Sequence, residues 1–152
     1  MLEIIEDDLS GPEIAALLAE HKQDMVDTSP EDAVFTLPID ALRSPEVVVW
    51  SAWVDSELAG CGALKEIDAK SGEVKSMRTS TTHRGMGIGS AICEHIINEA
   101  RSRGYDVLYI ETGSHPAFEP AHRLYQKQGF EYRGPFGDYQ ANEFSRFMQL
   151  KL

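Results

Sequence analysis

The chain has 152 residues, of which 42% are hydrophobic and 26% charged, so it is long enough for one well-packed domain and lacks a disordered composition. Its formal net charge of −11 argues against nucleic-acid binding, because attraction to phosphates supplies much of that affinity. No apolar run reaches the roughly 20 residues of a membrane span, and the first residues lack the features of a signal peptide. We therefore expect a single cytoplasmic domain over residues 1–152, with no nucleic-acid or membrane partner.

The N-terminal third combines one strand with helical segments. Residues 2–6 are typical of a short strand, and a helix begins at Ser10-Gly11-Pro12, with Ser10 as the expected N-cap and Pro12 in the first turn. One face of this helix carries Ile14, Leu17, Leu18 and, at its rim, His21. Residues 24–40 are irregular because of their prolines, with room for a short helix near residues 29–32 and a turn at residues 40–43.

Three consecutive strands follow, at residues 47–54, 58–67 and 73–79. They are rich in apolar and β-branched residues and are separated by short turns, which predicts antiparallel pairing. Gly60 and Gly62 lie inside the middle strand and predict a bulge or the close approach of another backbone there.

Helices and strands alternate in the C-terminal half. A helix at residues 89–103 carries an apolar stripe and ends at Gly104. The apolar strand at residues 106–112 suits the buried centre of a sheet. A helix at residues 121–128 and strands at 130–132 and 144–152 complete the chain. The order β-α-α-β-β-β-α-β-α-β-β predicts a mixed sheet of the α/β (α+β) class with helices on both faces.

The most informative stretch is His83-Arg84-Gly85-Met86-Gly87-Ile88-Gly89-Ser90, at the start of the predicted central helix. Glycines let the backbone turn and expose its amides, and a helix N-terminus adds unpaired N–H groups and a positive dipole end. Such a loop can bind phosphate groups. The spacing fits neither the G-x-G-x-x-G dinucleotide fingerprint nor the lysine-containing P-loop. The remaining pattern is Arg84-x-x-Gly87-x-Gly89, although an ordinary glycine-rich turn is the alternative.

This pattern resembles the R/Q-x-x-G-x-G/A signature of the GNAT superfamily of acyl-CoA-dependent N-acetyltransferases. A second stretch, from Pro120 to Phe130, resembles the A-x-x-L-Y-x-x-x-G-F helix of the same family. The order of elements resembles the GNAT order as well, most closely over residues 73–130. The resemblance implies a mostly antiparallel sheet of about six to seven strands, acetyl-CoA as the co-substrate and no metal.

The resemblance also implies a place for each part of the cofactor. The backbone of Met77, Arg78 and Thr79 would pair with the pantetheine arm, and the two neighbouring central strands splay apart in relatives to admit the thioester. The loop that would surround the pyrophosphate consists of Arg84, Gly85, Met86, Gly87, Ile88, Gly89 and Ser90. Because the chain is acidic, we expect local donors to offset its repulsion of an anionic cofactor, namely the loop amides with Arg78, His83 and Arg84.

Two residues are candidates for catalysis. An alkyl ammonium is almost entirely protonated at pH 7, so a base would help to release the amine, and Glu73 lies where histone-acetylating relatives carry theirs. Tyr125 occupies the tyrosine position of the second motif, and its phenol would donate a proton or hydrogen bond to the departing thiolate. The alternatives are a solvated carboxylate at the end of a strand for Glu73 and a packed aromatic side chain for Tyr125.

Other candidate residues are less well defined. Phe118 stands where many relatives have an asparagine that contacts the pantetheine arm, so its role is open. His115, Glu119 and His122 lack a metal-binding spacing, and Cys93 and His95 would point apart on a helix. The candidates for the acceptor pocket are His21, Phe35, Trp50, Glu111 and Tyr139, with Glu111 or Asp138 able to pair with a cationic amine.

The predicted function is transfer of an acetyl group from acetyl-CoA to a primary amine of a small molecule, by direct attack in a ternary complex. Two alternatives remain open at this point: a protein or peptide N-acetyltransferase, and a catalytically silent acyl-CoA sensor. The sequence is compatible with a homodimer but does not require one.

Overall fold

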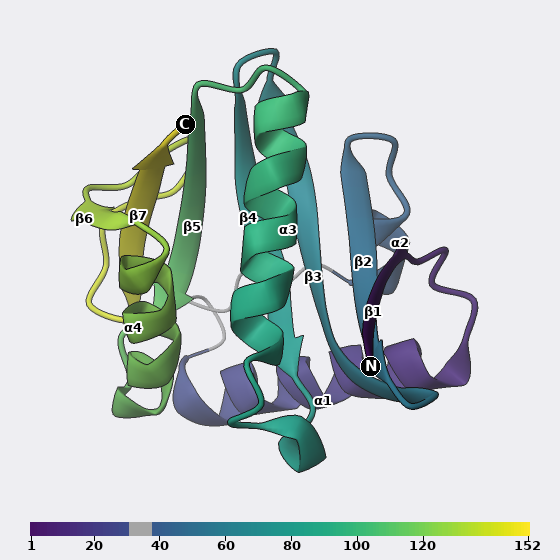
Figure 1. The fold of residues 1–152 in the computed structure, drawn as a ribbon. Helices are drawn as coiled ribbons and strands as arrows, with labels where there is room; N and C mark the ends of the chain where they lie inside the picture. Colours follow the sequence, from purple (N-terminus) through teal and green to yellow (C-terminus); the bar gives the residue numbers. More distant parts are fainter. Residues whose placement is uncertain (31–37) are drawn as a thin grey trace.

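The computed structural model describes residues 1–30 and 38–152, so Phe35 and part of the helix predicted near residues 29–32 lie outside it. The strands and helices follow the predicted order (Figure 1), and their bounds are β1 Leu2–Glu6, α1 Pro12–Thr28, α2 Ile39–Leu42, β2 Val47–Val54, β3 Glu57–Asp68, β4 Ser71–Thr79, α3 Ile88–Ser102, β5 Val107–Gly113, α4 Glu119–Lys127, β6 Glu131–Arg133 and β7 Ser145–Lys151. Short 3-10 turns at Thr81–His83 and Pro116–Phe118 precede α3 and α4. Among the described residues, no helix is both long enough and apolar enough to span a membrane.

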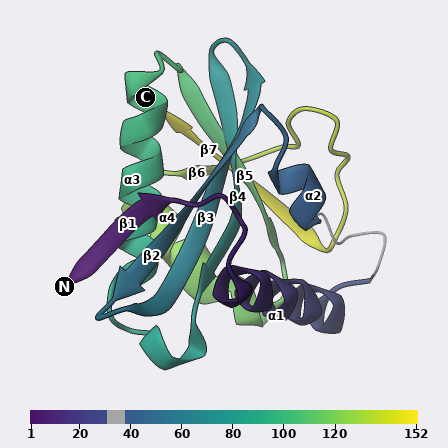
Figure 2. The same ribbon diagram turned by 90° about the vertical axis from the view of Figure 1, so that its right-hand side faces the viewer.

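The described strands form one seven-stranded sheet in the order β1-β2-β3-β4-β5-β7-β6. Neighbouring strands are antiparallel except β4 and β5, which are parallel. This confirms the predicted mixed, mostly antiparallel sheet. Figure 2 shows α3 and α4 on one side of the sheet and α1 and α2 on the other, as expected for helices on both faces.

Each face of the sheet has its own apolar core. The α3 stripe packs on one face, with Ile92, Ile96 and Ala100 fully buried against sheet residues such as Leu64 and Leu108. The second core is smaller and lies beneath α1, where Ile14 and Leu17 are packed with residues of β2 and β3. The burial of the apolar stripe of α3 agrees with the spacing of its apolar residues in the sequence.

The start of α1 differs from the prediction. Gly11, not Ser10, is the N-cap, and no side chain caps the helix. The Ser10 hydroxyl instead donates to Asp8 Oδ1 at 2.6 Å, while Pro12 lies at the first helical positions as expected. A local serine–aspartate hydrogen bond therefore takes the hydroxyl that would otherwise have bonded to the helix amides.

A bulge in β4 changes the direction of the strand next to the glycine loop. Its register with β3 passes from Ala63↔Lys75 to Cys61↔Arg78, so β4 carries one residue more than β3 over this stretch. Ser76 lies at the bulge with a φ of 54°, in the left-handed region that most residues avoid. The predicted irregularity around Gly60 and Gly62 is thus confirmed.

Beyond this bulge, β4 and β5 part. Their pairing runs only from Ser71↔Val107 to Val74↔Ile110, although both strands continue further. From Lys75 to Thr79, therefore, the edge of β4 that faces β5 has no strand partner among the described residues. A free strand edge can accept the backbone hydrogen bonds of an extended ligand.

Alanine at Gly60 should lower the free energy of unfolding by about 1–3 kcal/mol, the usual range for overpacking. A Cβ at Gly60 would lie 2.8 Å from the Arg78 carbonyl oxygen, which belongs to the backbone of β4 and cannot move alone. Urea denaturation measures the difference. Gly134→Ala is the matched control, because a Cβ there meets nothing within 4 Å; equal stability of the two variants would contradict the prediction.

Candidate active site

The glycine loop before α3 is open and its backbone is held in unusual conformations. Gly85 and Gly87 have φ angles of 79° and 76°, and a Cβ on either would meet no protein atom within 4 Å. Gly87 is the N-cap of α3, and the loop from Arg84 to Gly87 is exposed. A helix of this length presents unpaired amides and a positive dipole end to whatever enters the loop, which suits an anion.

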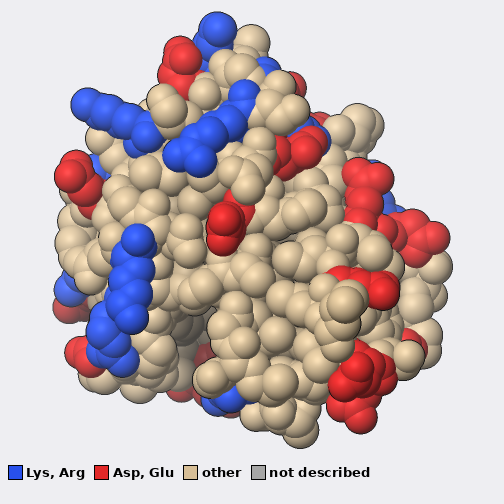
Figure 3. All heavy atoms as spheres, viewed as in Figure 1, with Lys and Arg blue, Asp and Glu red and all other residues tan. Residues whose placement is uncertain are grey.

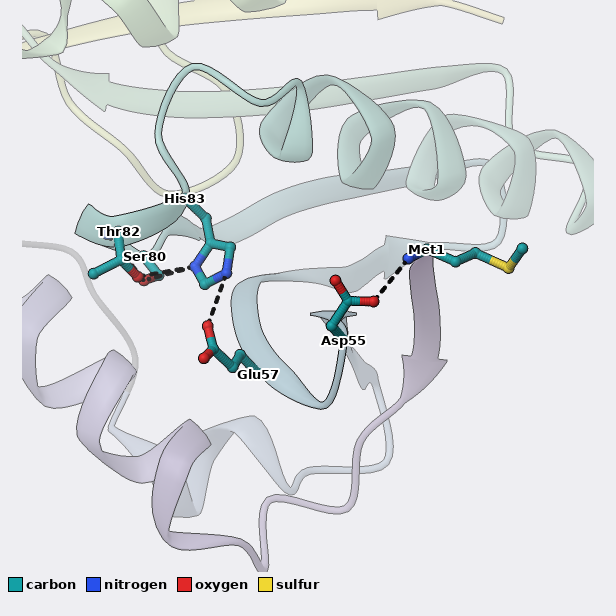
Figure 4. A network of polar contacts seen from close by, with 6 residues as sticks. All are labelled: Met1, Asp55, Glu57, Ser80, Thr82 and His83. Carbon is teal, nitrogen blue, oxygen red and sulfur yellow. Dashed lines mark hydrogen bonds and ion pairs between the residues drawn. The ribbon is translucent and has the colours of Figure 1, made fainter.

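The turn before the loop is anchored by His83, which the sequence suggested as an anion donor. Its side chain is buried, and its Nδ1 lies 3.0 Å from Thr82 Oγ1. Its Nε2 lies 3.5 Å from Glu57 Oε2, at the start of β3. Figure 4 shows the ring between Ser80 and Thr82 on one side and Glu57 on the other. The prediction for this side chain is therefore corrected: His83 binds protein groups that hold the loop to the sheet.

The Arg78 side chain was also expected near the cofactor phosphates, and it too has protein partners. Its guanidinium pairs with Glu20 and Asp24 of α1. Burial opposes the charge on Arg78, but the two carboxylates outweigh it and leave its pKa raised. Two acidic residues one helical turn apart thus hold α1 against β4. The terminal nitrogens of this guanidinium are therefore held by protein carboxylates and do not face the glycine loop as free donors.

A pocket occupies the space where β4 and β5 separate. Figure 3 shows that the surface is hollowed between α4 and the first half of α3. The pocket is bordered by both parted strands, by α1, by the residue before α4 and by the last turn of α4. Its lining residues are His21, Met25, Val74, Lys75, Ser76, Met77, Ile110, Glu111, Thr112, Gly113, Phe118 and Tyr125. The pocket therefore lies next to the free edge of β4 and contains titratable side chains such as Glu111 and Tyr125.

Tyr125 lies in this lining and is 5% exposed. Its ring packs edge-on against Phe130, with centroids 5.8 Å apart. The tyrosine and the phenylalanine of the second motif are therefore in contact with each other. Burial raises the pKa of Tyr125, and the nearby Cys93 acts in the same direction. The phenol is therefore protonated at neutral pH and can act as a hydrogen-bond donor.

Glu73 is not the solvated carboxylate of the alternative interpretation. It is 6% exposed, and its Oε2 accepts hydrogen bonds from the Tyr139 hydroxyl at 2.7 Å and from Lys75 Nζ at 3.1 Å. Lys75 Nζ also lies 2.9 Å from the Tyr139 hydroxyl. Burial raises the pKa of Tyr139, and the Glu73 carboxylate raises it further. The three side chains form a closed polar triangle, which we call the Glu73 triangle.

Glu111 on β5 has a different environment. It lines the pocket, and its Oε2 is buried without a hydrogen-bond partner among the described residues. Burial raises the pKa of Glu111 to about 7; the Ser145 hydroxyl and Lys75 oppose the shift, and Glu73 adds to it. The sequence placed Glu111 among acceptor-pocket candidates but gave no sign of this burial, because its neighbours come from distant segments.

The remaining acceptor-pocket candidates divide between the pocket and other places. His21 lines the pocket, and burial lowers its pKa to about 4, with Arg78 contributing. Trp50 lies instead in the α3 core, 5.4 Å from the His95 ring, because β2 turns it to the opposite face. Asp138 is exposed. Phe118 lines the pocket and packs on Gly113.

The histidine and the cysteine that the sequence offered for metal or thiol chemistry are, respectively, hydrogen-bonded to protein groups and buried. His122 Nε2 lies 2.9 Å from the Gly113 carbonyl oxygen, and its Nδ1 lies 3.1 Å from the Tyr132 hydroxyl. Cys93 is buried, which raises its pKa to about 12. Within residues 1–30 and 38–152, no three His, Cys, Asp or Glu side chains are arranged to hold a metal ion.

Comparison with known proteins agrees with this geometry. The profile of the acetyltransferase (GNAT) family matches residues 12–130. The chain is 49% identical over 146 residues to the Bacillus subtilis protein YsnE, described as an uncharacterized N-acetyltransferase, covering 96% of this chain and 97% of that one. A Klebsiella pneumoniae structure described as an acyl-CoA N-acyltransferase superposes with a TM-score of 0.79 at 28% identity, covering 100% and 98% of the two chains. A Bacillus subtilis acetyltransferase solved with CoA has the same fold, with a TM-score of 0.72 at 22% identity and coverage of 100% and 99%.

Proposed function

The chain belongs to the GNAT family of acetyltransferases, and from this premise we propose that it moves an acetyl group from acetyl-CoA to a primary amine of a small molecule. The amine attacks the thioester directly while both substrates are bound. The observation that carries this proposal is the pocket at the parting of β4 and β5, which meets a free strand edge and a buried tyrosine. The excess of acidic residues is compatible with a cationic acceptor.

Acetyl-CoA would lie along the parted strands. Its pantetheine arm would pair with the backbone of Met77, Arg78 and Thr79, on the edge of β4 that faces β5. Its pyrophosphate would contact the loop Arg84–Ser90, whose amides and exposed Arg84 supply positive groups. The thioester would then enter the pocket, where Tyr125 is the proposed donor to the departing thiolate and Glu73 is the carboxylate predicted from the sequence to assist the amine.

A melting experiment tests cofactor binding. Acetyl-CoA at about a hundred times its Kd should add about 2.7 kcal/mol to the free energy of unfolding, which for a domain of this size raises Tm by several degrees. The same concentration of adenosine is the control, because it lacks the pyrophosphate. No shift with acetyl-CoA or any other acyl-CoA would refute the proposal.

Turnover separates this function from its alternatives. Release of free CoA thiol, measured with a panel of small primary amines and of peptides with free N-termini, should be fastest with a small amine. Faster turnover of peptides would favour a peptide acetyltransferase. Binding without any turnover would favour the acyl-CoA sensor.

A further inference from the structure

We propose that Glu111, on β5, is the group that takes the proton from the acceptor's ammonium, while the Glu73 triangle supports it from β4. The inference rests on the proposed acetyl transfer and goes beyond it by assigning the proton acceptor. Three features of the site support this assignment. Glu111 lines the pocket, one of its carboxylate oxygens has no hydrogen-bond partner among the described residues, and charged groups surround it.

The pocket distinguishes the two carboxyl groups. Glu111 belongs to its lining, whereas Glu73 is absent from the described residues that line it. Glu73 Oε2 already accepts two hydrogen bonds, from Tyr139 and Lys75. Glu111 Oε2 has no hydrogen-bond partner among the described residues, and the Ser145 hydroxyl, which is near enough to lower the pKa of Glu111, is itself unpaired there. A buried carboxylate oxygen without a donor is costly. An ammonium group that enters the pocket would first donate a hydrogen bond to this oxygen. It would then transfer a proton to the same oxygen.

The groups around Glu111 determine the pH range in which its carboxyl is charged. Lys75 and Glu73 face it from β4, and Tyr139 faces it from the segment between β6 and β7, which Figure 2 shows on the same side of the sheet as α1. His21 reaches the same pocket from α1. With a pKa raised by burial to about 7, Glu111 can both hold and release a proton near neutral pH.

The other titratable groups of the pocket are poorer acceptors. Burial lowers the pKa of His21 to about 4, so its ring does not hold a proton at neutral pH. Lys75 carries three donors and no acceptor while it is charged against Glu73. Tyr125 is protonated, and its proposed role is to donate a hydrogen bond to the departing thiolate. Glu111 is therefore the acceptor that the described pocket offers.

The proton balance has two steps. An N–H bond of the ammonium breaks and an O–H bond forms on the Glu111 carboxylate, which later releases this proton to solvent. The neutral amine then forms a C–N bond with the thioester carbonyl, and the C–S bond breaks. The second proton leaves the nitrogen as the amide forms and ends on the CoA sulfur, with Tyr125 as hydrogen-bond donor to the thiolate. Products are the amide, CoA thiol and one released proton.

The pH profile of Glu111→Gln tests this assignment with the best amine of the panel. In the wild type, kcat/KM should rise as Glu111 loses its proton and level off above about pH 7. In Glu111→Gln it should be about 100-fold lower at pH 7, within the usual range for a general base. It should then keep rising about tenfold per pH unit toward the pKa of the free amine near 10, because only neutral amine reacts.

Two further variants make the result decisive. Glu66→Gln, at an exposed glutamate of β3, controls for the loss of one negative charge and should keep the wild-type profile. Glu73→Gln should lower the rate and keep a profile that levels off, with its rise moved to lower pH because the Glu73 charge raises the pKa of Glu111. If Glu111→Gln stays within threefold of the wild type at pH 7, or if only Glu73→Gln shows the continuous rise, the assignment is overturned. The proposed function itself would still stand, because wild-type turnover and acetyl-CoA binding are measured separately.

Discussion

Alanine at Gly87 should weaken acetyl-CoA binding by at least about tenfold, which corresponds to about 1.4 kcal/mol. The substitution places a methyl group in the open loop where we propose that the pyrophosphate lies. A Cβ there meets no protein atom within 4 Å, so the variant loses little packing. It does incur a conformational cost of roughly 1–2 kcal/mol, because φ is 76°. Isothermal titration with acetyl-CoA gives the affinity.

Gly104 provides a control with the same conformational cost. Its φ is 79°, and a Cβ there also meets nothing within 4 Å, but it follows the far end of α3. Gly87→Ala and Gly104→Ala should therefore lose similar stability in urea, while only the first loses affinity. Equal acetyl-CoA affinity in the two variants would show that the pyrophosphate binds elsewhere.

Phenylalanine at Tyr125 should lower kcat by about 100-fold, because removal of one donor to a developing negative charge commonly has an effect of this size. Acetyl-CoA affinity should stay within about threefold, since the ring remains. The raised pKa of Tyr125 favours a hydrogen bond to the thiolate over complete proton transfer, because a CoA-like thiol has a pKa near 8.5. Steady-state thiol release with the best amine measures the change.

Tyr105 is the matched control for this substitution. It is also 5% exposed, but its hydroxyl donates to Glu66 Oε1 at 2.8 Å, near the paired ends of β4 and β5. Tyr105→Phe should cost about 1 kcal/mol of stability through the lost hydrogen bond and leave kcat unchanged. If Tyr125→Phe behaves in the same way, its hydroxyl has no role in the reaction.

Local pattern was enough to predict most of the framework. The apolar stripe of α3 and the glycines before it predicted a helix that begins at the loop, and the structure places its first residue at Ile88. The short turns between β2, β3 and β4 predicted antiparallel neighbours. These features depend on side-chain periodicity and on turn residues, which act over a few positions.

The charged side chains of the site were harder to predict. Arg78 and His83 were expected to meet the cofactor, yet their partners are Glu20 and Asp24 in one case and Glu57 in the other. Nothing near Arg78 in the sequence indicates an acidic pair on α1, because Glu20 lies 58 residues away. Basic residues near a phosphate-binding loop are therefore ambiguous until their neighbours are known.

From the order of its residues alone, this protein can be identified as a GNAT-type mixed sheet with a glycine loop at the start of its central helix and a tyrosine on the following helix. The folded chain alone shows that the Ser76 bulge accompanies a parting of β4 and β5, and that Glu73 and Glu111 differ in their surroundings. The reason is that burial and charge at this site come from segments such as Tyr139, 66 residues from Glu73. A proton acceptor is defined by those distant neighbours, and a short motif does not contain them.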